Sequence, residues 1–496
     1  MAGYLLGLDN GGTIIKAAIF DTMGKEIGVA SRSTKMHTPR PGYTQRDMEE
    51  LWQLNCQCIK EVLEATNTPP EEILGMALCG HGKGLYPWGK DGKPAYSGIV
   101  STDNRAWEYP EKWRQSGVFE NLSPRLCQQL IPCQQVSLLA WLKDNEPKVY
   151  KNIQWAFSVK DYLRFRLTGE AFCEATDISG SGLMNVRDAK FDRDIPEALG
   201  IGEAYEMLAP LKYSADMCGT ITQQAARLTG LAPGTPVAGG MFDIDACAIA
   251  MAITEPHQLC SIIGTWSINE FISKSPVQIA MNSLYAIPGY YLIEECSATG
   301  AANLDWVLEN IIGKEAQDPY AQANNMVYSV SAEDCDVYYL PFLYGSNTHS
   351  LAKASFVGLT SFHNKSHMVR AVFEGVAFST KTHIDRLLSV RQRPKSLRLA
   401  GGIVNSPLWV QMLSDVLNIP IETVSGVTEQ GALGAAMSAA VAAGVYDSYQ
   451  QAAEAMVSIQ PPIYPNPRQT AIYSEKFEKY KAITEALYTV WARGDL

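Results

Sequence analysis

A short segment near the N-terminus carries residue types that bind phosphate. Asp9 to Thr13 reads DNGGT and separates two apolar runs, and Lys16 follows three residues later. Glycines such as Gly12 let backbone N–H groups approach an anion closely, and Thr13 adds a hydroxyl donor. Asp9, at the end of a predicted strand, suits Mg²⁺, which prefers oxygen ligands and is held directly or through water. The alternative is a plain β-turn, for which Asn-Gly and Gly-Gly are preferred.

A second copy of this turn stands in the other half of the chain. When Gly12-Thr13 is aligned with Gly264-Thr265, LDNGGTIIKAAIF lies over CSIIGTWSINEFI. Both copies read as apolar strand, Gly-Thr turn and apolar strand, and Ser261 takes the place of Asp9. Such a repeat indicates a duplicated domain. We expect two related halves with a cleft between them, and two turns that grip a polyphosphate.

An acidic segment follows a pair of glycines in the middle of the chain. The run GGMFDIDA, residues 239–246, places Asp243 and Asp245 between a predicted strand and a small-residue helix. A carboxylate at a helix N-terminus stays ionised and can accept the proton of a hydroxyl group. Either Asp could do this, and helix capping alone is the alternative for each.

Two loops after predicted strands are dense in hydrogen-bonding groups. They read CGHGKGL, residues 79–85, and STDNRAW, residues 101–107. Recognition of a polyol needs several fixed donors and acceptors on short loops. The alternatives are a solvent-facing turn for His81, a solvated side chain for Lys83 and a surface ion pair for Asp103 and Arg105.

A glycine pair before a helix marks one more candidate site. The run from Leu399 to Glu422 reads as a strand, Gly401-Gly402 and a helix that begins near Ser406. Ser caps a helix, and the Pro after it suits the first turn. This pattern suits the ribose or phosphate of a nucleotide, with simple strand–helix packing as the alternative.

Periodicity predicts an α/β chain that positions these loops. Short apolar runs predict strands, and apolar residues at helical spacing predict helices. A new strand–turn–strand pattern after residue 258 places a domain boundary near residue 250, giving domains 1–250 and 251–496. The predicted strands are 4–8, 14–20, 26–31, 73–78 and 237–238, and the predicted helices are 48–65, 136–143, 159–167, 221–229, 246–253 and 474–492.

The composition limits the classes of binding partner that we expect. The chain has 496 residues, 41 Lys and Arg, 52 Asp and Glu, and a net charge of −11. An acidic balance argues against nucleic acid or an anionic membrane as a partner, because both need a basic surface. No signal peptide or membrane-length apolar run is seen, and the 11 Cys are scattered. We therefore expect a cytoplasmic protein with reduced cysteines.

Taken together and in order, these motifs resemble the FGGY carbohydrate kinases of the actin/hexokinase/Hsp70-like superfamily. The opening matches D-x-G-T-x-x-K, and the run from Gly401 to Leu417 resembles the second family signature. The stretch LLAWLKDNEP with VKDYLRFRLTGE resembles the first signature, except that Leu138 stands where a Lys is usual. EQGALGAA, residues 429–436, resembles the C-terminal companion helix. The resemblance covers about Tyr4 to Ala455.

The resemblance implies two ribonuclease H-like domains with a cleft between them. It implies a sugar-binding and catalytic-base domain, 1–250, and a nucleotide-binding domain, 251–496. Such enzymes transfer the γ-phosphoryl group of ATP, with Mg²⁺, to a terminal hydroxyl of a sugar or polyol. Asp243 fits the family's base pattern, D-x-x-A-x-x-x-small, and Asp245 does not. The other implied roles are metal for Asp9, nucleotide for Gly12, Thr13, Lys16, Gly264, Thr265, Gly401, Gly402, Asn405 and Ser406, and sugar for His81, Lys83, Asp103 and Arg105.

The loop at residues 79–85, to which the resemblance assigns sugar binding, limits which sugars are candidate substrates. D-xylulose kinases typically carry Q-M-H-G there, and Lys83 takes the place of that His. The loop, together with PFLYGSN (341–347) and EGVAFS (374–379), looks most like the L-xylulose kinase branch. Lys83 would also suit a substrate carboxylate, as in a keto-sugar acid. Another pentulose, a linear polyol and an inactive nucleotide-binding regulator stay as alternatives, and a homodimer stays open beside a monomer.

Overall fold

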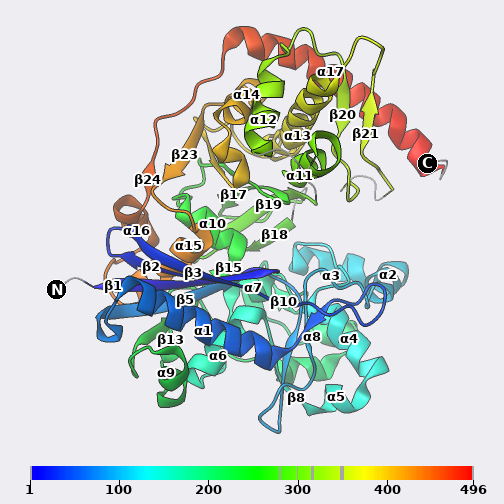
Figure 1. Cartoon of the computed structure of the whole chain (residues 1–496). Coiled ribbons are helices and arrows are strands. Elements are labelled where there is room, and N and C mark those ends of the chain that lie inside the picture. The colour runs from blue at the N-terminus through cyan, green and yellow to red at the C-terminus, as the bar shows by residue number, and fades with distance from the viewer. Residues whose placement is uncertain (1–2, 279–280, 299, 314–317, 347–350, 494–496) are drawn as a thin grey trace. The chain divides into compact units, whose positions relative to one another are not determined.

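Two α/β units make up the chain, and neither is one continuous stretch of sequence. The computed structural model describes residues 3–278, 281–298, 300–313, 318–346 and 351–493 (Figure 1). The first unit combines Met1–Thr254 with Ile272–Ile293 and Gly426–Ser458. The second combines Glu255–Phe271 with Glu294–Ser425 and Ile459–Leu496.

The sheet of the first unit grows from the apolar runs at the start of the chain. Its strands lie in the order β13-β14-β5-β1-β2-β3, and β15 also pairs with β5. β1 is antiparallel to β2 and parallel to β5, and β5 is parallel to β14 and β15. β5 is buried along nearly its whole length, as expected for a central strand covered on both faces. The bounds are β1 Tyr4–Asn10, β2 Ile14–Asp21, β3 Glu26–Ser33, β5 Ile73–Gly80, β13 Met217–Thr220, β14 Pro236–Ala238 and β15 Met241–Phe242.

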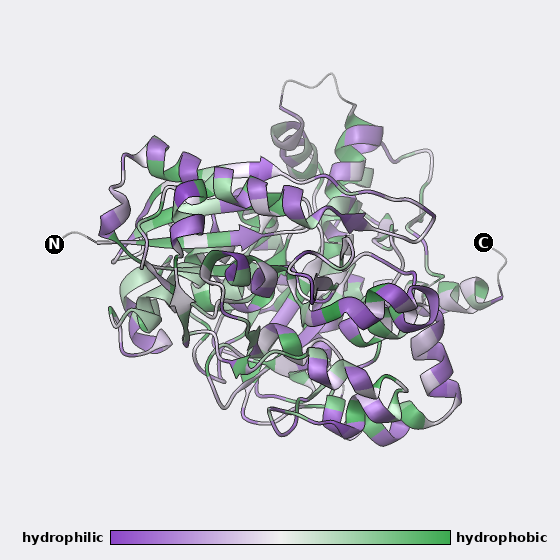
Figure 2. Ribbon diagram, turned by 90° about the horizontal axis from the view of Figure 1, so that it is seen from below, coloured by the Kyte–Doolittle hydropathy of each residue, from purple (hydrophilic) through white to green (hydrophobic). Residues whose placement is uncertain are grey.

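Helices cover both faces of this sheet. α1 (Met48–Thr66) packs on β2 and β3, and α15 (Gln430–Ala442) packs on β1 and β5 from the opposite side (Figure 1). Glycine permits the second contact, because a Cβ on Gly7 would lie 1.8 Å from the carbonyl oxygen of Ala432. Hydrophilic and hydrophobic residues interleave along many of the helices (Figure 2), as expected when one side of a helix faces solvent.

Apart from β18, which belongs to a second seven-stranded sheet, the remaining elements of the first unit form short strand pairs and helices, several of which share their own apolar core. They are β4 Gln45–Arg46, β6 Tyr86–Gly89, β7 Gly98–Ile99, α2 Glu108–Gln115, α3 Val118–Leu126, α4 Gln135–Asn145, α5 Pro147–Asn152, β8 Ile153–Phe157, α6 Val159–Thr168, β9 Cys173–Glu174, α7 Ala175–Ser179, β10 Met184–Asn185, β11 Lys190–Phe191, α8 Asp194–Ala198, β12 Leu211–Lys212, α9 Gln223–Thr229, α10 Asp243–Ala250, β18 Met281–Leu284 and α16 Tyr449–Met456.

The second unit repeats the central pattern of the first. Its strands lie in the order β19-β17-β16-β22-β23 within a seven-stranded sheet, which matches β3-β2-β1-β5-β14. β16 is antiparallel to β17 and parallel to β22, as β1 is to β2 and β5. The repeat of the Gly-Thr hairpin in the sequence is therefore a repeat of strand topology. The bounds are β16 Cys260–Ile263, β17 Ser267–Ser273, β19 Tyr291–Ser297, β22 Leu397–Ala400 and β23 Ile421–Ser425.

Helices and the short strands β20, β21 and β24 complete the second unit. α13 packs against α11, α12 and α14, and α14 also packs against the long helix α17. The bounds are α11 Ala302–Val307, α12 Pro319–Tyr328, β20 Tyr338–Leu340, β21 Ser355–Val357, α13 Lys365–Leu388, α14 Pro407–Leu417, β24 Ser458–Ile459 and α17 Pro467–Ala492.

Two predicted helix starts were placed too late. α10 begins at Asp243 rather than near residue 246, so the candidate base lies in its first turn. α17 begins at Pro467, because Asn466 caps it and Pro fits the first helical position. All 11 cysteines are free thiols. Among the helices of the described residues, none combines the length and apolar character that crossing a bilayer requires.

Candidate active site

Three parallel strands of the first unit end at one edge and bring three sequence motifs together. Cys79 of β5 pairs with Asp9 of β1 on one side and with Met241 of β15 on the other. His81 directly follows β5, and Asp243 directly follows β15. Ligands of open α/β sheets bind at the carboxyl ends of the strands. The predicted metal, sugar and base residues therefore occupy the edge where such a site is expected.

One carboxylate oxygen of Asp9 accepts no hydrogen bond. Its Oδ1 is buried and has no hydrogen-bond partner. Burial raises the pKa of Asp9 to about 6, although the Cys79 thiol and Lys16 oppose the rise. Its other oxygen lies against α15, where a Cβ on Gly431 would come within 2.7 Å. This carboxylate is short of positive partners, which is the condition that a bound cation would relieve.

A buried arginine binds the DNGGT turn between β1 and β2. Nη2 of Arg46 donates to the carbonyl oxygen of Gly12 at 3.1 Å, while Thr13 is exposed. Lys16 lies on β2 and forms an ion pair with Glu429 at 2.6 Å. Burial alone would lower the pKa of Lys16, but Glu429 raises it overall, so the side chain stays charged.

Asp243 and Asp245 differ in environment although they share the first turn of α10. Asp245 is fully buried, and its Oδ1 accepts the N–H of Ala286 at 3.1 Å. Asp243 is partly exposed. Burial, followed by the charges of Asp9 and Asp177, raises the pKa of Asp243 well above its usual value, and Lys83 lowers it. A raised carboxyl pKa is typical of a proton acceptor at a catalytic site.

The loop after β5 folds over the residue that precedes Asp243. A Cβ on Gly82 would meet the ring of Phe242 at 2.5 Å, and Nζ of Lys83 lies 5.3 Å from the centre of that ring. Lys83 has a left-handed backbone with φ of 63°. His81 is buried, with Nε2 2.9 Å from the hydroxyl of Tyr86 and 3.3 Å from Nη2 of Arg46. Burial, assisted by Arg46, lowers the pKa of His81 to about 3, so it is neutral at pH 7.

Asp103 and Arg105 form an ion pair, but a buried one. Nη2 of Arg105 lies 2.8 Å from Oδ2 of Asp103, and both side chains are fully buried. Asp103 also accepts the N–H of Thr44, and Arg105 donates to Gln45. The alternative of a surface ion pair is therefore wrong. The pair joins the loop at residues 101–105 to the segment around β4.

In the second unit, the two nucleotide motifs lie against each other. Gly401 follows β22 with φ of 91°, and a Cβ there would lie 2.4 Å from the carbonyl oxygen of Ile263 and 3.0 Å from the nitrogen of Gly264. Gly264 and Gly402 have open space where a side chain would be, and Thr265 is exposed. Two glycine turns at the ends of the parallel strands β16 and β22 thus form one surface.

Ser406 fixes the corner that leads into α14. Its hydroxyl accepts the N–H of Trp409 at 3.3 Å and donates to Asn324 at 2.7 Å. Asn405 ends the short 3₁₀ turn between Gly402 and this cap. The predicted nucleotide residues of the second unit therefore form one corner, and those of the first unit form another.

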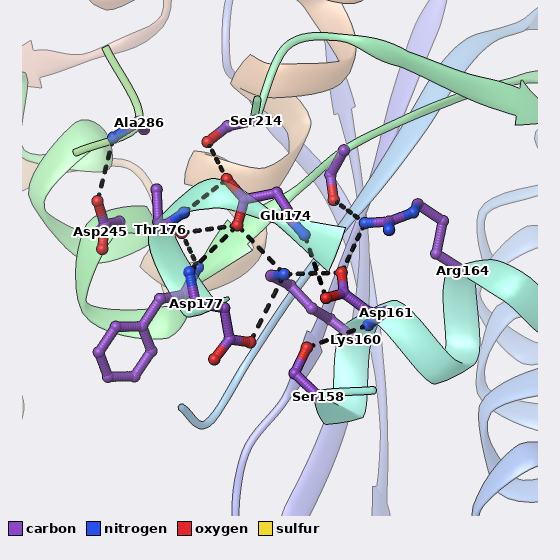
Figure 3. A network of polar contacts seen from close by, with 12 residues as sticks. Ser158, Lys160, Asp161, Arg164, Glu174, Thr176, Asp177, Ser214, Asp245 and Ala286 are labelled. Atoms are coloured by element: carbon purple, nitrogen blue, oxygen red, sulfur yellow. Dashed lines mark hydrogen bonds and ion pairs between the residues drawn. The ribbon is translucent and has the colours of Figure 1, made fainter. Parts of the chain in front are cut away.

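A buried polar network, which binds the N–H of Phe242 just before Asp243, was not predicted as part of the site (Figure 3). It contains Lys160 and Arg164 of α6, Glu174 of β9, and Thr176 and Asp177 of α7. The sequence signal was a Lys-Asp pair inside an apolar helical pattern, VKDYL. Fully buried charges are rare unless paired, so this pair was a reason to expect buried partners.

Comparison with known proteins decides the family. The profile for the FGGY family of carbohydrate kinases, N-terminal domain, matches residues 4–250, and that for the C-terminal domain matches 259–443. The chain belongs to the FGGY family of carbohydrate kinases. It is 36% identical to a probable L-xylulose kinase of Pasteurella multocida, over 98% of this chain and 99% of the relative. It is 35% identical to the L-xylulose/3-keto-L-gulonate kinase of Escherichia coli K12, over 99% of each.

The fold agrees with this assignment. The crystal structure of a gluconate kinase from Lactobacillus acidophilus superposes with a TM-score of 0.91 at 22% identity, over 99% of this chain and 100% of that one. This FGGY kinase therefore has the two-domain fold of the actin/hexokinase/Hsp70-like superfamily. It is a carbohydrate kinase that uses ATP and a sugar as substrates.

Proposed function

We propose that this kinase phosphorylates the terminal hydroxyl of a small ketose, L-xylulose or a related keto-sugar. Two relatives at 35–36% identity over nearly their whole length are named for L-xylulose, and one also for 3-keto-L-gulonate. In this proposal, residues 1–250 hold the sugar and the base, and residues 251–496 hold the nucleotide. The observation that carries the proposal is Asp243, a carboxyl group at the end of β15 beside the ends of β1 and β5.

In this reaction Asp243 accepts the proton of the attacking hydroxyl. Phosphoryl transfer depends mainly on positioning and on electrostatic stabilisation. Lys83 and the neutral His81 lie on the loop that packs over Phe242, and in this proposal they bind the sugar beside the base. The exposed turn at Thr13 offers backbone N–H groups and a hydroxyl to the phosphates. Gly264 and Gly401 offer a second surface of the same kind, without side chains in the way.

Asp9 fits the role of a residue that holds Mg²⁺. Its unpartnered, buried Oδ1 and its raised pKa describe a carboxylate that gains from a cation. Mg²⁺ commonly takes one carboxylate together with waters and substrate phosphates. No group of three or more His, Cys, Asp or Glu side chains in the described part of the chain is arranged to hold a metal. Bound Mg²⁺ would neutralise charge on the ATP phosphates.

The substrate is tested by measuring ADP release with L-xylulose, D-xylulose, L-ribulose, 3-keto-L-gulonate, erythritol and glycerol. We expect the highest kcat/KM with L-xylulose or 3-keto-L-gulonate. Turnover of erythritol or glycerol alone would show a linear-polyol kinase and overturn the ketose proposal. Equal turnover of D-xylulose and L-xylulose would overturn the L-xylulose preference.

The base is tested with Asp243→Asn, which keeps the size of the side chain and removes the proton acceptor. We expect kcat to fall at least about 100-fold, because general base catalysis typically supplies 10²–10⁴-fold, while ATP binding stays within about twofold. Asp245→Asn is the matched control in the same helical turn, with kcat measured per folded molecule. Loss of turnover in Asp245→Asn but not in Asp243→Asn would reverse the assignment.

An acidic keto-sugar is a specific candidate because Lys83 lies beside the base. Its cation lowers the pKa of Asp243 and stacks over Phe242. If Lys83 binds a substrate carboxylate, Lys83→Met should raise KM for 3-keto-L-gulonate by about tenfold or more, since a hydrogen bond to a charged group is worth roughly 1.5–3 kcal/mol. KM for L-xylulose should change much less. Equal increases for both sugars would exclude a carboxylate-specific role.

A further inference from the structure

We propose that the buried chain Lys160–Glu174–Thr176 positions the β15–α10 corner and thereby the carboxylate of Asp243. These three residues are positioning residues, because they reach the reaction only through the backbone of Phe242. The inference rests on the proposed role of Asp243 as base. The contacts that carry it lie within the first unit, and Figure 3 shows the network.

The direct link is one hydrogen bond. Oγ1 of Thr176 accepts the N–H of Phe242 at 2.8 Å. Phe242 is the N-cap residue of α10, and Asp243 is the first residue of that helix. The side chain of Asp243 therefore leaves the backbone one residue after the anchored N–H. A displacement of this anchor moves the carboxylate with it.

Glu174 fixes the direction of that bond. Its Oε2 accepts the hydroxyl proton of Thr176 at 2.8 Å, so the oxygen of Thr176 is left to accept from Phe242. The carboxylate also accepts the N–H of Thr176 at 3.0 Å and the hydroxyl of Ser214 at 2.8 Å. Because an ionised carboxylate only accepts, these donors keep Glu174 as the acceptor in each bond.

Lys160 binds Glu174 at the end of this series of contacts that is farthest from Phe242. Its Nζ lies 2.9 Å from Asp161, 3.2 Å from Glu174 and 3.5 Å from Asp177, and its side chain is fully buried. Burial alone would lower the pKa of Lys160, but the three carboxylates raise it overall, so the charge is retained.

A second arm of the same network holds the start of the corner. Nη1 of Arg164 lies 2.7 Å from Asp161 and donates to the carbonyl oxygen of Gly239 at 2.7 Å. The N–H of Gly240 donates to the carbonyl oxygen of Ser214 at 3.0 Å. The segment 239–242 is thus tied to one network at both ends, just before the base.

Stability alone does not account for such a cluster. Replacing buried ion pairs by packed apolar residues is often neutral or stabilising, because taking charges out of water is costly. What the cluster supplies is fixed geometry. Catalysis is sensitive to this geometry, since a misplacement of about 1 Å can cost about 100-fold in rate.

The test is Thr176→Val, which keeps the shape of the side chain and removes the acceptor for Phe242. We expect kcat per folded molecule to fall about 10- to 100-fold, KM for ATP to stay within about twofold, and Thr176→Ser to restore kcat. The matched control is Thr229→Val. Thr229 is also fully buried, and its hydroxyl also donates to one acceptor and accepts one backbone N–H, at Ala225 and Leu231. Its kcat should stay near that of the parent.

The kcat values of these variants show whether the positioning role fails alone or together with the base assignment. If Asp243→Asn keeps the parent kcat, the base assignment fails and this inference fails with it. If Asp243→Asn is inactive but Thr176→Val and Thr229→Val have equal kcat, only the positioning role is overturned. A failure of Thr176→Ser to restore kcat also overturns it. If Thr176→Val does not fold, Thr176→Ala against Thr229→Ala gives the same comparison.

Discussion

At the scale of single residues, charge at the strand ends sets the chemistry. Burial raises the pKa of Asp9, Asp177 and Asp243, and the charges of Asp9 and Asp177 raise the pKa of Asp243 further. Lys83 opposes this effect at Asp243. A base with a raised pKa takes up a proton more readily, but it must be ionised before the reaction begins. The activity of this kinase should therefore be lost on acidification at a higher pH than for an ordinary Asp.

This reasoning predicts a pH profile with a defined sign. Turnover needs ionised Asp243, so kcat/KM should fall as pH falls through the raised pKa. Asp177→Asn removes a negative neighbour that raises this pKa. The pH at which kcat/KM falls on acidification should then be lower than in the parent enzyme. Asp192→Asn, which alters a carboxylate held by Arg125 at 2.9 Å, is the control and should leave this pH unchanged. An unchanged pH in Asp177→Asn would contradict the electrostatic account.

The sequence revealed some of these residues and concealed others for a physical reason. Asp9 and Asp243 each follow an apolar run next to glycines, and this local pattern marks the end of a strand. The partners of the buried network are distant in sequence, since Arg164 meets Gly239 across 75 positions and Thr176 meets Phe242 across 66. A contact of that range depends on the packed fold and leaves no local pattern.

At the scale of elements, small residues on α15 bring helix and strand backbones into contact. A Cβ on Gly434 would lie 2.0 Å from the carbonyl oxygen of Ala246 in α10, and one on Gly7 would lie 1.8 Å from that of Ala432. The sequence pattern EQGALGAA predicted the helix and a family likeness. Its packing against α10 and β1 could not be read from the pattern, because the contacting backbones lie far away in sequence.

Gly434→Ala should therefore lower the free energy of unfolding by about 1–3 kcal/mol, the usual cost of overpacking a core. Urea denaturation followed by circular dichroism measures it. Gly202→Ala is the control, because its Cβ would lie 3.0 Å from the side-chain Cγ of Glu197, which can move, and at an ordinary 3.7 Å from the Cα of Glu197. The control should change the stability by less than about 0.5 kcal/mol. Equal stability of the two variants would show that α15 and α10 separate easily.

At the scale of the whole molecule, one strand pattern is used twice, and the residues predicted as base and metal ligand lie in the first copy. Asp9 of β1 corresponds to Ser261 of β16 in the repeat. The predicted base and metal residues all lie in the first unit, and the second unit offers glycine turns at matching strand ends. The net charge argued against nucleic acid as a general partner, but it said nothing about ATP, which these turns bind through backbone N–H groups in our proposal.

The first unit depends on a segment from late in the chain. Gly426–Ser458 belongs to it and includes α15, which covers β1 and β5. Without this segment, one face of the central strands would be open to water. Exposed apolar surface costs about 25 cal/mol per Å², so about 200–600 Å² of it would equal the usual stability of a domain, roughly 5–15 kcal/mol.

A fragment of residues 1–293 should therefore fail to fold cooperatively. The same fragment fused to residues 426–458 through a flexible linker should unfold in one transition, because α15 can return to its place on the sheet. Thermal denaturation followed by circular dichroism distinguishes the two outcomes, and a fusion carrying Gly434→Trp, which cannot pack against Ala246, is the matched control. Cooperative unfolding of 1–293 alone would show that the strands close their core without α15.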